Sequence, residues 1–288
     1  MLIRIMTLIV LLIFNTSWAE PIHIIAAENF YGDIAAKLGG NYVSVDSILN
    51  NPKQDPHLFS INPAIAKAIT HADIIIYNGL DYDSWMENLI TANSQKKLVI
   101  VVADLMKKKS GDNPHIWYDP NTMLVYATYL VKQLSLLDVQ HKDYFQQQLT
   151  LFKQQYQLLI NKVIIDKTKW LHTPVIATEP VFNDMANTLG LTMYGLHFQL
   201  SVMNDTEPSA ADIKDFQNKL MTRSVKVLII NNQVSDPLTQ RMEEIAQKAN
   251  IPIVGVSETE PPMQDYFTWM RDQLINLEKA LGESGERN

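Results

Sequence analysis

Short runs of apolar, β-branched residues alternate with amphipathic stretches along the first third of the chain. The apolar runs predict four strands, at residues 22–27, 43–48, 74–77 and 98–102. The stretches between them predict three helices, at residues 31–38, 63–69 and 85–90. Asn62 is a suitable N-cap for the second helix, because Pro63 follows it at the first helical position. Apolar strands separated by helices indicate a parallel sheet that is buried on both faces.

A different pattern occupies residues 143–167, where neither glycine nor proline interrupts the chain. Apolar side chains recur there at alternating steps of four and three, at Phe145, Leu149, Phe152, Tyr156, Leu159 and Val163. This spacing predicts one amphipathic helix of about 25 residues, roughly 40 Å long. Its other face is rich in glutamine and offers poor charge pairing for a coiled-coil dimer. We therefore interpret it as a rigid connection that packs along two lobes.

The alternation of strands and helices returns after this long helix. It predicts strands at residues 174–177, 225–230 and 251–256, and helices at residues 181–189, 238–249 and 266–281. The predicted fold class is α/β, with two lobes that each hold a central parallel sheet flanked by helices, joined by one long rigid helix. We place the N-terminal lobe at residues 20–137, the connecting helix at residues 138–168 and the C-terminal lobe at residues 169–288.

Residues 1–19 have the pattern of a targeting signal. Arg4 precedes an apolar run, and the small residues Ser17 and Ala19 stand two apart. This arrangement predicts a signal peptide that is cleaved after Ala19, because the apolar run is too short for a membrane span of about 20 residues. No cysteine follows the small residues. We therefore expect a periplasmic protein that is secreted through a cleavable signal peptide and is not lipid-anchored.

Composition narrows the choice of function by exclusion. The 288 residues are 47% hydrophobic and 19% charged, which favours one large or two ordinary globular domains over a disordered chain. The absence of cysteine excludes disulfide scaffolds, thiolate zinc sites and thiol nucleophiles. A formal net charge of −7 argues against a nucleic-acid-binding surface. Neither His-Glu-x-x-His nor Gly-x-Ser-x-Gly occurs, so the common hydrolase motifs are missing.

Four polar side chains lie just beyond predicted strands. His57 and His115 each follow a proline after the second and fourth strands, and Glu179 and Glu258 each lie two residues past a strand of the second half. Ligands of open α/β sheets bind beyond the carboxyl ends of the strands, so each lobe contributes two candidates. Two imidazoles and two carboxylates suit a divalent metal ion, whose charge the carboxylates cancel. The alternative for each residue is an ordinary loop position that caps a helix or faces water.

Six motifs resemble the metal-ion solute-binding proteins of ABC importers, the zinc- and manganese-binding family. They are Asn29-Phe30-Tyr31-Gly32, Asp55-Pro56-His57, Tyr77-Asn78-Gly79, Tyr82-Asp83-Ser84-Trp85-Met86, Asn113-Pro114-His115-Ile116-Trp117-Tyr118-Asp119-Pro120 and Thr206-Glu207-Pro208-Ser209. The likeness runs in order from about residue 22 to residue 281. The combination of Asp-Pro-His with Pro-His-Ile-Trp is the specific part of it.

The resemblance implies one metal ion in a cleft between two lobes that are joined by a rigid helix. It implies that His57 and His115 are the ligands of the N-terminal lobe and that Glu179 is the third ligand. The fourth ligand of the family is usually an aspartate after the last strand, and we assign this role to Glu258. Glu260 is a nearby rival because it lies in the same stretch. His197 would replace Glu258 if that match is wrong.

The resemblance also implies a binding protein rather than an enzyme. Its cargo would be a single divalent ion, Mn²⁺ or Zn²⁺ or else Fe²⁺, which it would deliver to the membrane permease of an ABC transporter. A glutamate as third ligand resembles the manganese or iron type, and oxygen ligands suit Mn²⁺, although Zn²⁺ binds more tightly in vitro. We expect a monomer with no nucleic-acid partner. The competing hypotheses are a secreted zinc-dependent hydrolase and a metal-binding adhesin.

Overall fold

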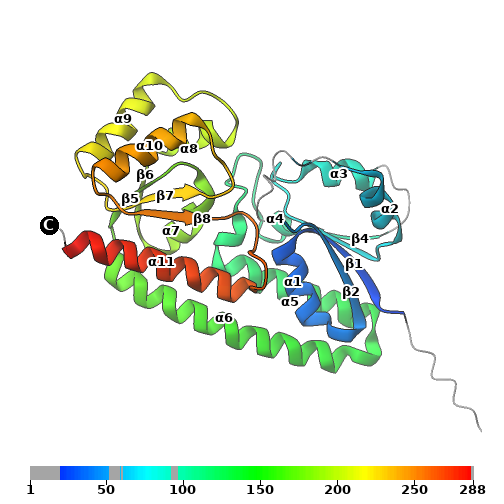
Figure 1. The fold of residues 1–288 in the computed structure, drawn as a ribbon. Coiled ribbons are helices and arrows are strands. Elements are labelled where there is room, and N and C mark those ends of the chain that lie inside the picture. Colours follow the sequence, from blue (N-terminus) through cyan, green and yellow to red (C-terminus); the bar gives the residue numbers. More distant parts are fainter. Residues whose placement is uncertain (1–19, 52–58, 60, 92–96, 287–288) are drawn as a thin grey trace, which may run out of the picture.

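The computed structural model describes residues 20–51, 59, 61–91 and 97–286. These residues form two lobes, each built on a sheet of four parallel strands. The long helix α6 (Lys142–Trp170) runs beneath both lobes and connects them (Figure 1). The predicted α/β class, with two lobes and one long connecting helix, is therefore confirmed.

The N-terminal lobe carries its sheet in the order β2-β1-β3-β4. Its strands are β1 (Ile22–Glu28), β2 (Val43–Leu49), β3 (Ile74–Tyr77) and β4 (Leu98–Val101). Its helices are α1 (Asn29–Gly39), α2 (Pro63–His71), α3 (Ser84–Thr91), α4 (Val102–Leu105) and α5 (Pro120–Leu137), with 3₁₀ turns η1 (Gly40–Tyr42) and η3 (Ile116–Tyr118). As predicted, Asn62 caps α2, and its side-chain oxygen accepts hydrogen bonds from the backbone of Ala64 and Ile65.

The C-terminal lobe repeats this arrangement in the order β6-β5-β7-β8. Its strands are β5 (Pro174–Ala177), β6 (Thr192–Tyr194), β7 (Leu228–Asn231) and β8 (Ile253–Val256). Its helices are α7 (Asn183–Leu189), α8 (Leu196–Met203), α9 (Ala210–Met221), α10 (Pro237–Lys248) and α11 (Tyr266–Glu286), with the turn η5 (Pro180–Phe182), while η4 (Val139–His141) precedes α6. Gly190 ends α7 with a positive φ of 71°, a conformation that glycine adopts without strain.

Both sheets change direction at an equivalent place. In the N-terminal lobe the chain leaves β1 for β2 on one side and then returns to place β3 on the other. In the C-terminal lobe β5 is flanked in the same way by β6 and β7. In open α/β sheets, the crevice at the carboxyl ends of such a pair of strands is where ligands bind. The fold therefore offers one such position in each lobe.

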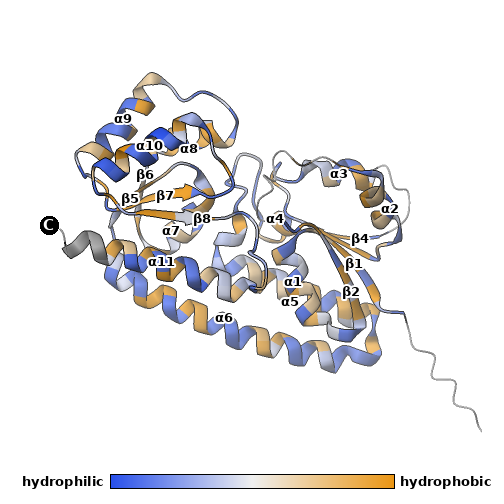
Figure 2. Cartoon of the chain, viewed as in Figure 1, coloured by the Kyte–Doolittle hydropathy of each residue, from blue (hydrophilic) through white to orange (hydrophobic). Residues whose placement is uncertain are grey.

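The two lobes share one hydrophobic core. It extends from Ile24 in β1 through Trp117 in η3 to Val254 in β8. Helix α6 packs on α1 and α5 of the N-terminal lobe and on α7 and α11 of the C-terminal lobe. Five of its six predicted apolar positions are buried, and Tyr156 is half-buried. Hydrophobic positions gather on the strands and on the inner faces of the helices (Figure 2). The lobes are therefore packed against each other as well as linked.

Some elements differ from the sequence-based expectation. The pattern analysis assigned no element to residues 120–137, 192–194, 196–203 or 210–221, which form α5, β6, α8 and α9. Strand β7 starts at Leu228 rather than residue 225, and β8 starts at Ile253 rather than residue 251, although the apolar residues just before them are buried. Among the described helices, none combines the length and the apolar character needed to cross a membrane.

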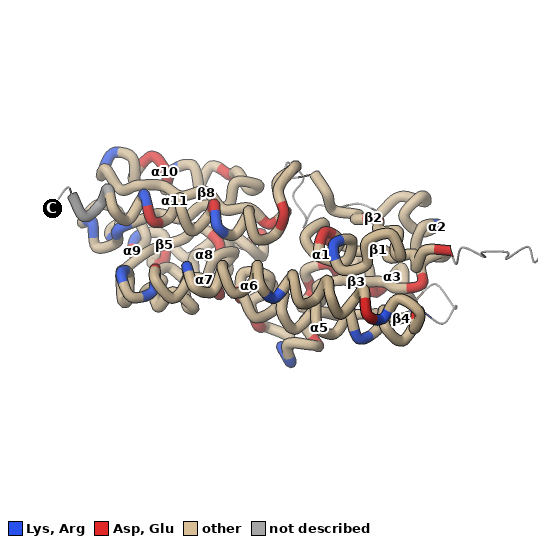
Figure 3. The backbone as a smooth tube through the Cα atoms, turned by 90° about the horizontal axis from the view of Figure 1, so that it is seen from below, with Lys and Arg blue, Asp and Glu red and all other residues tan. Residues whose placement is uncertain are grey.

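Charged residues of both signs are distributed over both lobes (Figure 3). In this view neither Lys and Arg nor Asp and Glu collect into one continuous face. The electrostatic features that matter for function are therefore local, and they lie at the junction of the two lobes.

Candidate metal centre

His115 lies at the junction, directly before η3, and its side chain is fully buried. Its ring nitrogen Nδ1 lies 2.8 Å from Asn113 Oδ1. The amide group of Asn113 is oriented by a second contact, because Asn113 Nδ2 donates to the carbonyl oxygen of Pro180 at 3.0 Å. Asn113 Oδ1 is thus an acceptor, and His115 carries its proton on Nδ1. The lone pair of His115 Nε2 is left to face the opposite lobe.

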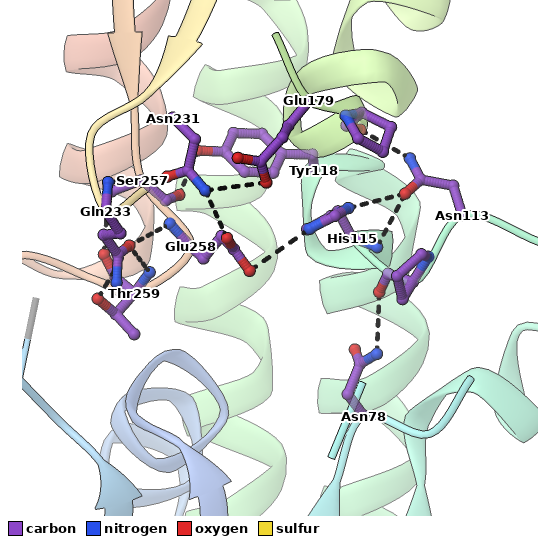
Figure 4. A network of polar contacts seen from close by, with 12 residues as sticks. Asn78, Asn113, His115, Tyr118, Glu179, Asn231, Gln233, Ser257, Glu258 and Thr259 are labelled. Atoms are coloured by element: carbon purple, nitrogen blue, oxygen red, sulfur yellow. Dashed lines mark hydrogen bonds and ion pairs between the residues drawn. The ribbon is translucent and has the colours of Figure 1, made fainter. Parts of the chain in front are cut away.

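Two carboxylates of the C-terminal lobe lie on that opposite side (Figure 4). Glu258 Oε2 lies 3.4 Å from His115 Nε2, and both side chains are fully buried. Glu179, which is 3% exposed, is linked to Glu258 through Asn231 at the end of β7. Asn231 Nδ2 donates to Glu179 Oε2 at 3.2 Å and to Glu258 Oε1 at 2.6 Å. One amide group therefore holds the two carboxylates side by side.

The loop that presents His115 is supported from below by Asn78, which follows β3 and is fully buried. Asn78 Nδ2 donates to the carbonyl oxygen of Pro114 at 2.9 Å, and Asn78 Oδ1 accepts from the hydroxyl of Tyr31 at 2.8 Å. Asp83 accepts hydrogen bonds from the backbone N–H groups of Asn78 and Gly79. The position of His115 thus depends on a chain of hydrogen bonds that starts in the core of the N-terminal lobe.

A buried acid pair lies in the same region. Burial, followed by the charge of Asp83, raises the pKa of Glu28 well above its usual value of 4.5. Burial raises the pKa of Asp83 to about 6, although backbone N–H groups favour its charged form. Burial and the Glu258 and Glu28 carboxylates raise the pKa of Tyr82 well above 10. Burial therefore favours the protonated form of all three groups.

Glu260 lies in a different environment from Glu258. Its backbone pairs with the side chain of Asn29 in α1, through N–H to Oδ1 at 3.1 Å and through Nδ2 to C=O at 2.7 Å. Burial, followed by the charge of Asp33, raises the pKa of Glu260 to about 9. Lys37 Nζ lies 2.9 Å from the carboxylates of both Asp33 and Asp265 close by. Glu260 is therefore part of a polar contact between the lobes.

The raised pKa of Glu260 predicts a pH-dependent stability. The folded chain keeps the proton up to about pH 9, whereas the unfolded chain loses it near pH 4.5. The contribution of this group to the free energy of unfolding therefore falls as pH rises through that window, by at most about 1.4 kcal/mol per pH unit. We expect the Glu260→Gln variant of the metal-free protein to lose less stability than the wild type between pH 5 and pH 9. Urea unfolding at pH 5, 7 and 9 measures this, and parallel pH profiles would contradict it.

Three of the four proposed ligands belong to one connected set of contacts. His115 Nε2 approaches Glu258 across the junction, and Asn231 links Glu258 to Glu179, whereas His57 lies outside the described residues. Within the described ranges, no three His, Asp or Glu side chains are close enough to enclose a metal ion by themselves. His197 lies on α8 with its side chain 83% exposed, 3.6 Å from Asp212. Its ion pair with Asp212 is separate from the contacts that link His115, Glu258 and Glu179.

The chemistry of the junction suits a divalent cation. It offers two carboxylates and the imidazole nitrogen His115 Nε2, which lies 3.4 Å from Glu258 Oε2, and all three side chains are buried. Carboxylate and imidazole groups together bind ions such as Mn²⁺, Fe²⁺ and Zn²⁺. His115 Nε2 also makes no hydrogen bond within the described residues. A buried nitrogen without a hydrogen-bond partner is expected where a metal ion takes the place of that partner. These three side chains are therefore described residues whose chemistry fits such an ion.

Sequence reasoning missed the residues that hold these groups in place. Asn231 follows an apolar run, the same signal that identified Glu179 and Glu258, and it could have been found in that way. Asn78 follows β3 and Asn113 precedes His115 by two residues, but their amide groups were not expected to orient the histidine. Gln233 accepts a hydrogen bond from the backbone N–H of Glu258 at 2.6 Å, and no local sequence pattern predicts this contact.

Comparison with known proteins places these features in a family. The ZnuA family, described as zinc-uptake complex component A, periplasmic, matches residues 24–280. The manganese ABC transporter substrate-binding lipoprotein PsaA of Streptococcus pneumoniae is 21% identical over 93% of this chain and 92% of its own length. The metal ABC transporter substrate-binding lipoprotein SloC of Streptococcus mutans is 25% identical over 92% and 91%, respectively. The manganese-binding lipoprotein MntA of Bacillus subtilis is 22% identical over 80% and 77%.

Solved structures show the same fold. The periplasmic zinc-binding protein TroA of Treponema pallidum superposes with a TM-score of 0.77 at 16% identity, over 91% of this chain and 99% of that one. A Mn-bound periplasmic metal-binding protein from Candidatus Liberibacter asiaticus superposes with a TM-score of 0.73 at 19% identity, over 90% and 99%. The two-lobed architecture is therefore shared with these proteins.

The same names correct one expectation. PsaA, SloC and MntA are all named as lipoproteins. This contradicts the prediction of a secreted periplasmic protein that is not lipid-anchored, which is therefore wrong. The prediction rested on the absence of cysteine and on residues 1–19, which lie outside the described residues.

Proposed function

Because the chain belongs to the ZnuA family of zinc-uptake complex components, we propose that it is the metal-binding component of an ABC importer. It binds one divalent transition-metal ion, Mn²⁺ or Zn²⁺ or Fe²⁺, between its two lobes and delivers the ion to a membrane permease. The ligands are His57, His115, Glu179 and Glu258. The observation that carries the proposal is the 3.4 Å approach of His115 Nε2 to Glu258 Oε2 across the junction.

The charges and positions of these residues support a buried cation. Two carboxylates cancel the charge of a divalent ion, which makes its transfer from water into a buried site tolerable. Glu179 lies beyond the end of β5 and Asn231 is the last residue of β7, where the sheet of the C-terminal lobe changes direction. His115 faces them from the N-terminal lobe. An ion bound here contacts both lobes and replaces the hydrogen bonds that now hold the carboxylates together.

The donor set bears on which ion is the natural cargo. Two carboxylates favour Mn²⁺ more than a three-histidine site does, whereas the Irving–Williams order favours Zn²⁺ at almost any site of this kind. We therefore expect tighter binding of Zn²⁺ in vitro even if Mn²⁺ is the ion transported. The names of the relatives differ in the same way, since the family is named for zinc and PsaA and MntA for manganese.

Calorimetric titration of chelator-treated protein tests the proposal. We expect one ion of Mn²⁺ or Zn²⁺ to bind per chain, with Zn²⁺ displacing Mn²⁺ in competition. Metal analysis of protein purified from its own cells then identifies the cargo, because overexpression elsewhere loads the most abundant ion. A chain that binds neither ion would contradict the proposal.

Asn113 supplies a further test, because it fixes which nitrogen of His115 faces the site. The Asn113→Ala variant removes the acceptor of the Nδ1 proton, so the imidazole can turn or change tautomer. We expect metal affinity to fall by about 10- to 100-fold, as is typical when the outer partner of a metal-binding histidine is lost. The Asn113→Asp variant keeps an acceptor oxygen and should lose less. Wild-type affinity in Asn113→Ala would show that His115 is oriented by other contacts.

A further inference from the structure

Residues 257–260, which carry Glu258, form a short segment after β8 that is attached to both lobes. On the side of the C-terminal lobe, Gln233 Oε1 accepts from the backbone N–H of Glu258 at 2.6 Å and of Thr259 at 3.1 Å. On the side of the N-terminal lobe, the hydroxyl of Tyr118 donates to the carbonyl oxygen of Ser257 at 2.7 Å (Figure 4). The 257–260 segment therefore bridges the junction at which the metal is proposed to bind.

Asn29 holds the other end of this segment. It is the first residue of α1, and its side-chain amide makes two hydrogen bonds to the backbone of Glu260, one donated and one accepted, at 2.7 and 3.1 Å. A planar amide that pairs in this way fixes the distance and the direction of the backbone that it holds. Tyr118 binds the backbone of Ser257, and Asn29 binds the backbone of Glu260. The segment is thus held on both sides of Glu258.

The two attachments differ in their surroundings. The hydroxyl of Tyr118 is buried and also lies 2.7 Å from Gln273 Oε1, within the packed aromatic core. Asn29 is half-buried at the edge of the junction, beside the ion pairs that Lys37 makes with Asp33 and Asp265. Asn29 can therefore be released without disturbing the core, whereas Tyr118 cannot.

We propose that Asn29 is a positioning residue that holds the Glu258-bearing segment against the N-terminal lobe and thereby sets how slowly the bound metal ion leaves. The inference rests on the proposed function, because it assumes that Glu258 is a ligand. Since Glu258 and His115 are fully buried, an ion held between them cannot leave until one of the ligand-bearing segments moves. Asn78 and Asn113 hold His115 in place, and Tyr118 holds residue 257 within the aromatic core. The half-buried attachment of Glu260 to Asn29 is the one that we assign to the moving step.

The test is the dissociation rate of Mn²⁺ and Zn²⁺ from the loaded chain, followed by stopped flow with an excess of EDTA. The Asn29→Ala variant removes both hydrogen bonds to Glu260, and the loss of buried pairing of this kind corresponds to roughly tenfold faster release. We expect the association rate to change little. The Asn29→Asp variant keeps the size of the side chain but cannot donate to the carbonyl oxygen of Glu260, so it should also release faster and serves if the alanine variant does not fold.

Ser209→Ala is the matched control. Ser209 caps α9, where its hydroxyl accepts from the backbone N–H of Asp212 at 3.1 Å, far along the chain from the 257–260 segment. Its loss destabilises the C-terminal lobe by a similar order, so it should leave the release rate unchanged. Hydrogen exchange of the Glu260 amide in the metal-free protein gives a second readout, and it should accelerate in Asn29→Ala but not in Ser209→Ala.

The outcomes separate the two proposals. Wild-type release rates in both Asn29 variants would overturn the positioning role while leaving metal binding intact. Equal acceleration in Ser209→Ala would also overturn it, because general destabilisation would then explain the effect. A wild-type chain that retains neither ion would overturn the proposed function, whereas the exchange of the Glu260 amide would still report whether Asn29 holds the segment.

Discussion

Replacing His115 by alanine should weaken the binding of Mn²⁺ and Zn²⁺ by at least about 100-fold. Loss of an outer partner of a metal ligand typically costs 10- to 100-fold, so loss of the ligand itself costs no less. Glu179→Ala and Glu258→Gln should behave in the same way, because each removes one charged oxygen donor from the site. Calorimetric titration of chelator-treated variants measures the effect, and circular dichroism verifies that each variant remains folded.

Two variants provide the controls for this series. His197 is an exposed histidine on α8, and His197→Ala should bind metal as the wild type does. The carboxylate of Glu260 lies beside Asp33 rather than His115, so Glu260→Gln should change the affinity by less than about threefold. Loss of binding in either control, or unchanged binding in His115→Ala, would require a different ligand set.

The second large effect concerns the packing between the lobes. Trp117 is fully buried, with ring centroids 4.8 Å from Phe30, 5.0 Å from Tyr82 and 5.3 Å from His115. Its carbonyl oxygen accepts from the hydroxyl of Tyr266 at 2.8 Å. Trp117→Ala leaves a large cavity at the junction, and we expect the free energy of unfolding to fall by about 3–5 kcal/mol. Urea unfolding of the metal-free protein measures this loss.

Two further variants serve as comparisons for Trp117→Ala, namely Trp117→Phe at the same position and Leu158→Ala on the surface. The indole N–H of Trp117 has no acceptor among the described residues, so the phenylalanine variant loses volume but no hydrogen bond and should cost less than alanine. Leu158 lies on the outer face of α6 and is 55% exposed, so its truncation should cost less than about 0.5 kcal/mol. A Trp117→Ala loss as small as that of Leu158→Ala would mean that the lobes are not packed as described.

Much of the fold could be predicted from local pattern. The apolar runs that became β1, β3 and β5 are continuous and bounded by clear breaks. The 4-3 spacing of α6 persists from Phe145 to Val163, about five turns, without glycine or proline. Helix α5 was missed although Asp119 and Pro120 mark its start, because its apolar residues surround much of the helix and give a weak period. Strand β6 is three residues long, too short for any pattern to register.

The site could be predicted only in part. His115, Glu179 and Glu258 follow strands or fall in a recognisable motif, so their positions were accessible from the sequence. Which of Glu258 and Glu260 faces the histidine depends on how the segment after β8 crosses the junction, and that path is set by Tyr118, Gln233 and Asn29 from distant parts of the chain. Contacts between residues so far apart in sequence leave no local signal.

The hydrophobic core that the two lobes share limits how far the protein can change shape when it binds its metal ion. Large rotations of one lobe against the other would open the aromatic packing around Trp117, so the empty and the filled molecule must have nearly the same outline. A membrane partner then has little overall shape change to sense. What differs is electrical, because a dication bound as proposed neutralises a pair of carboxylates that are buried where the lobes meet.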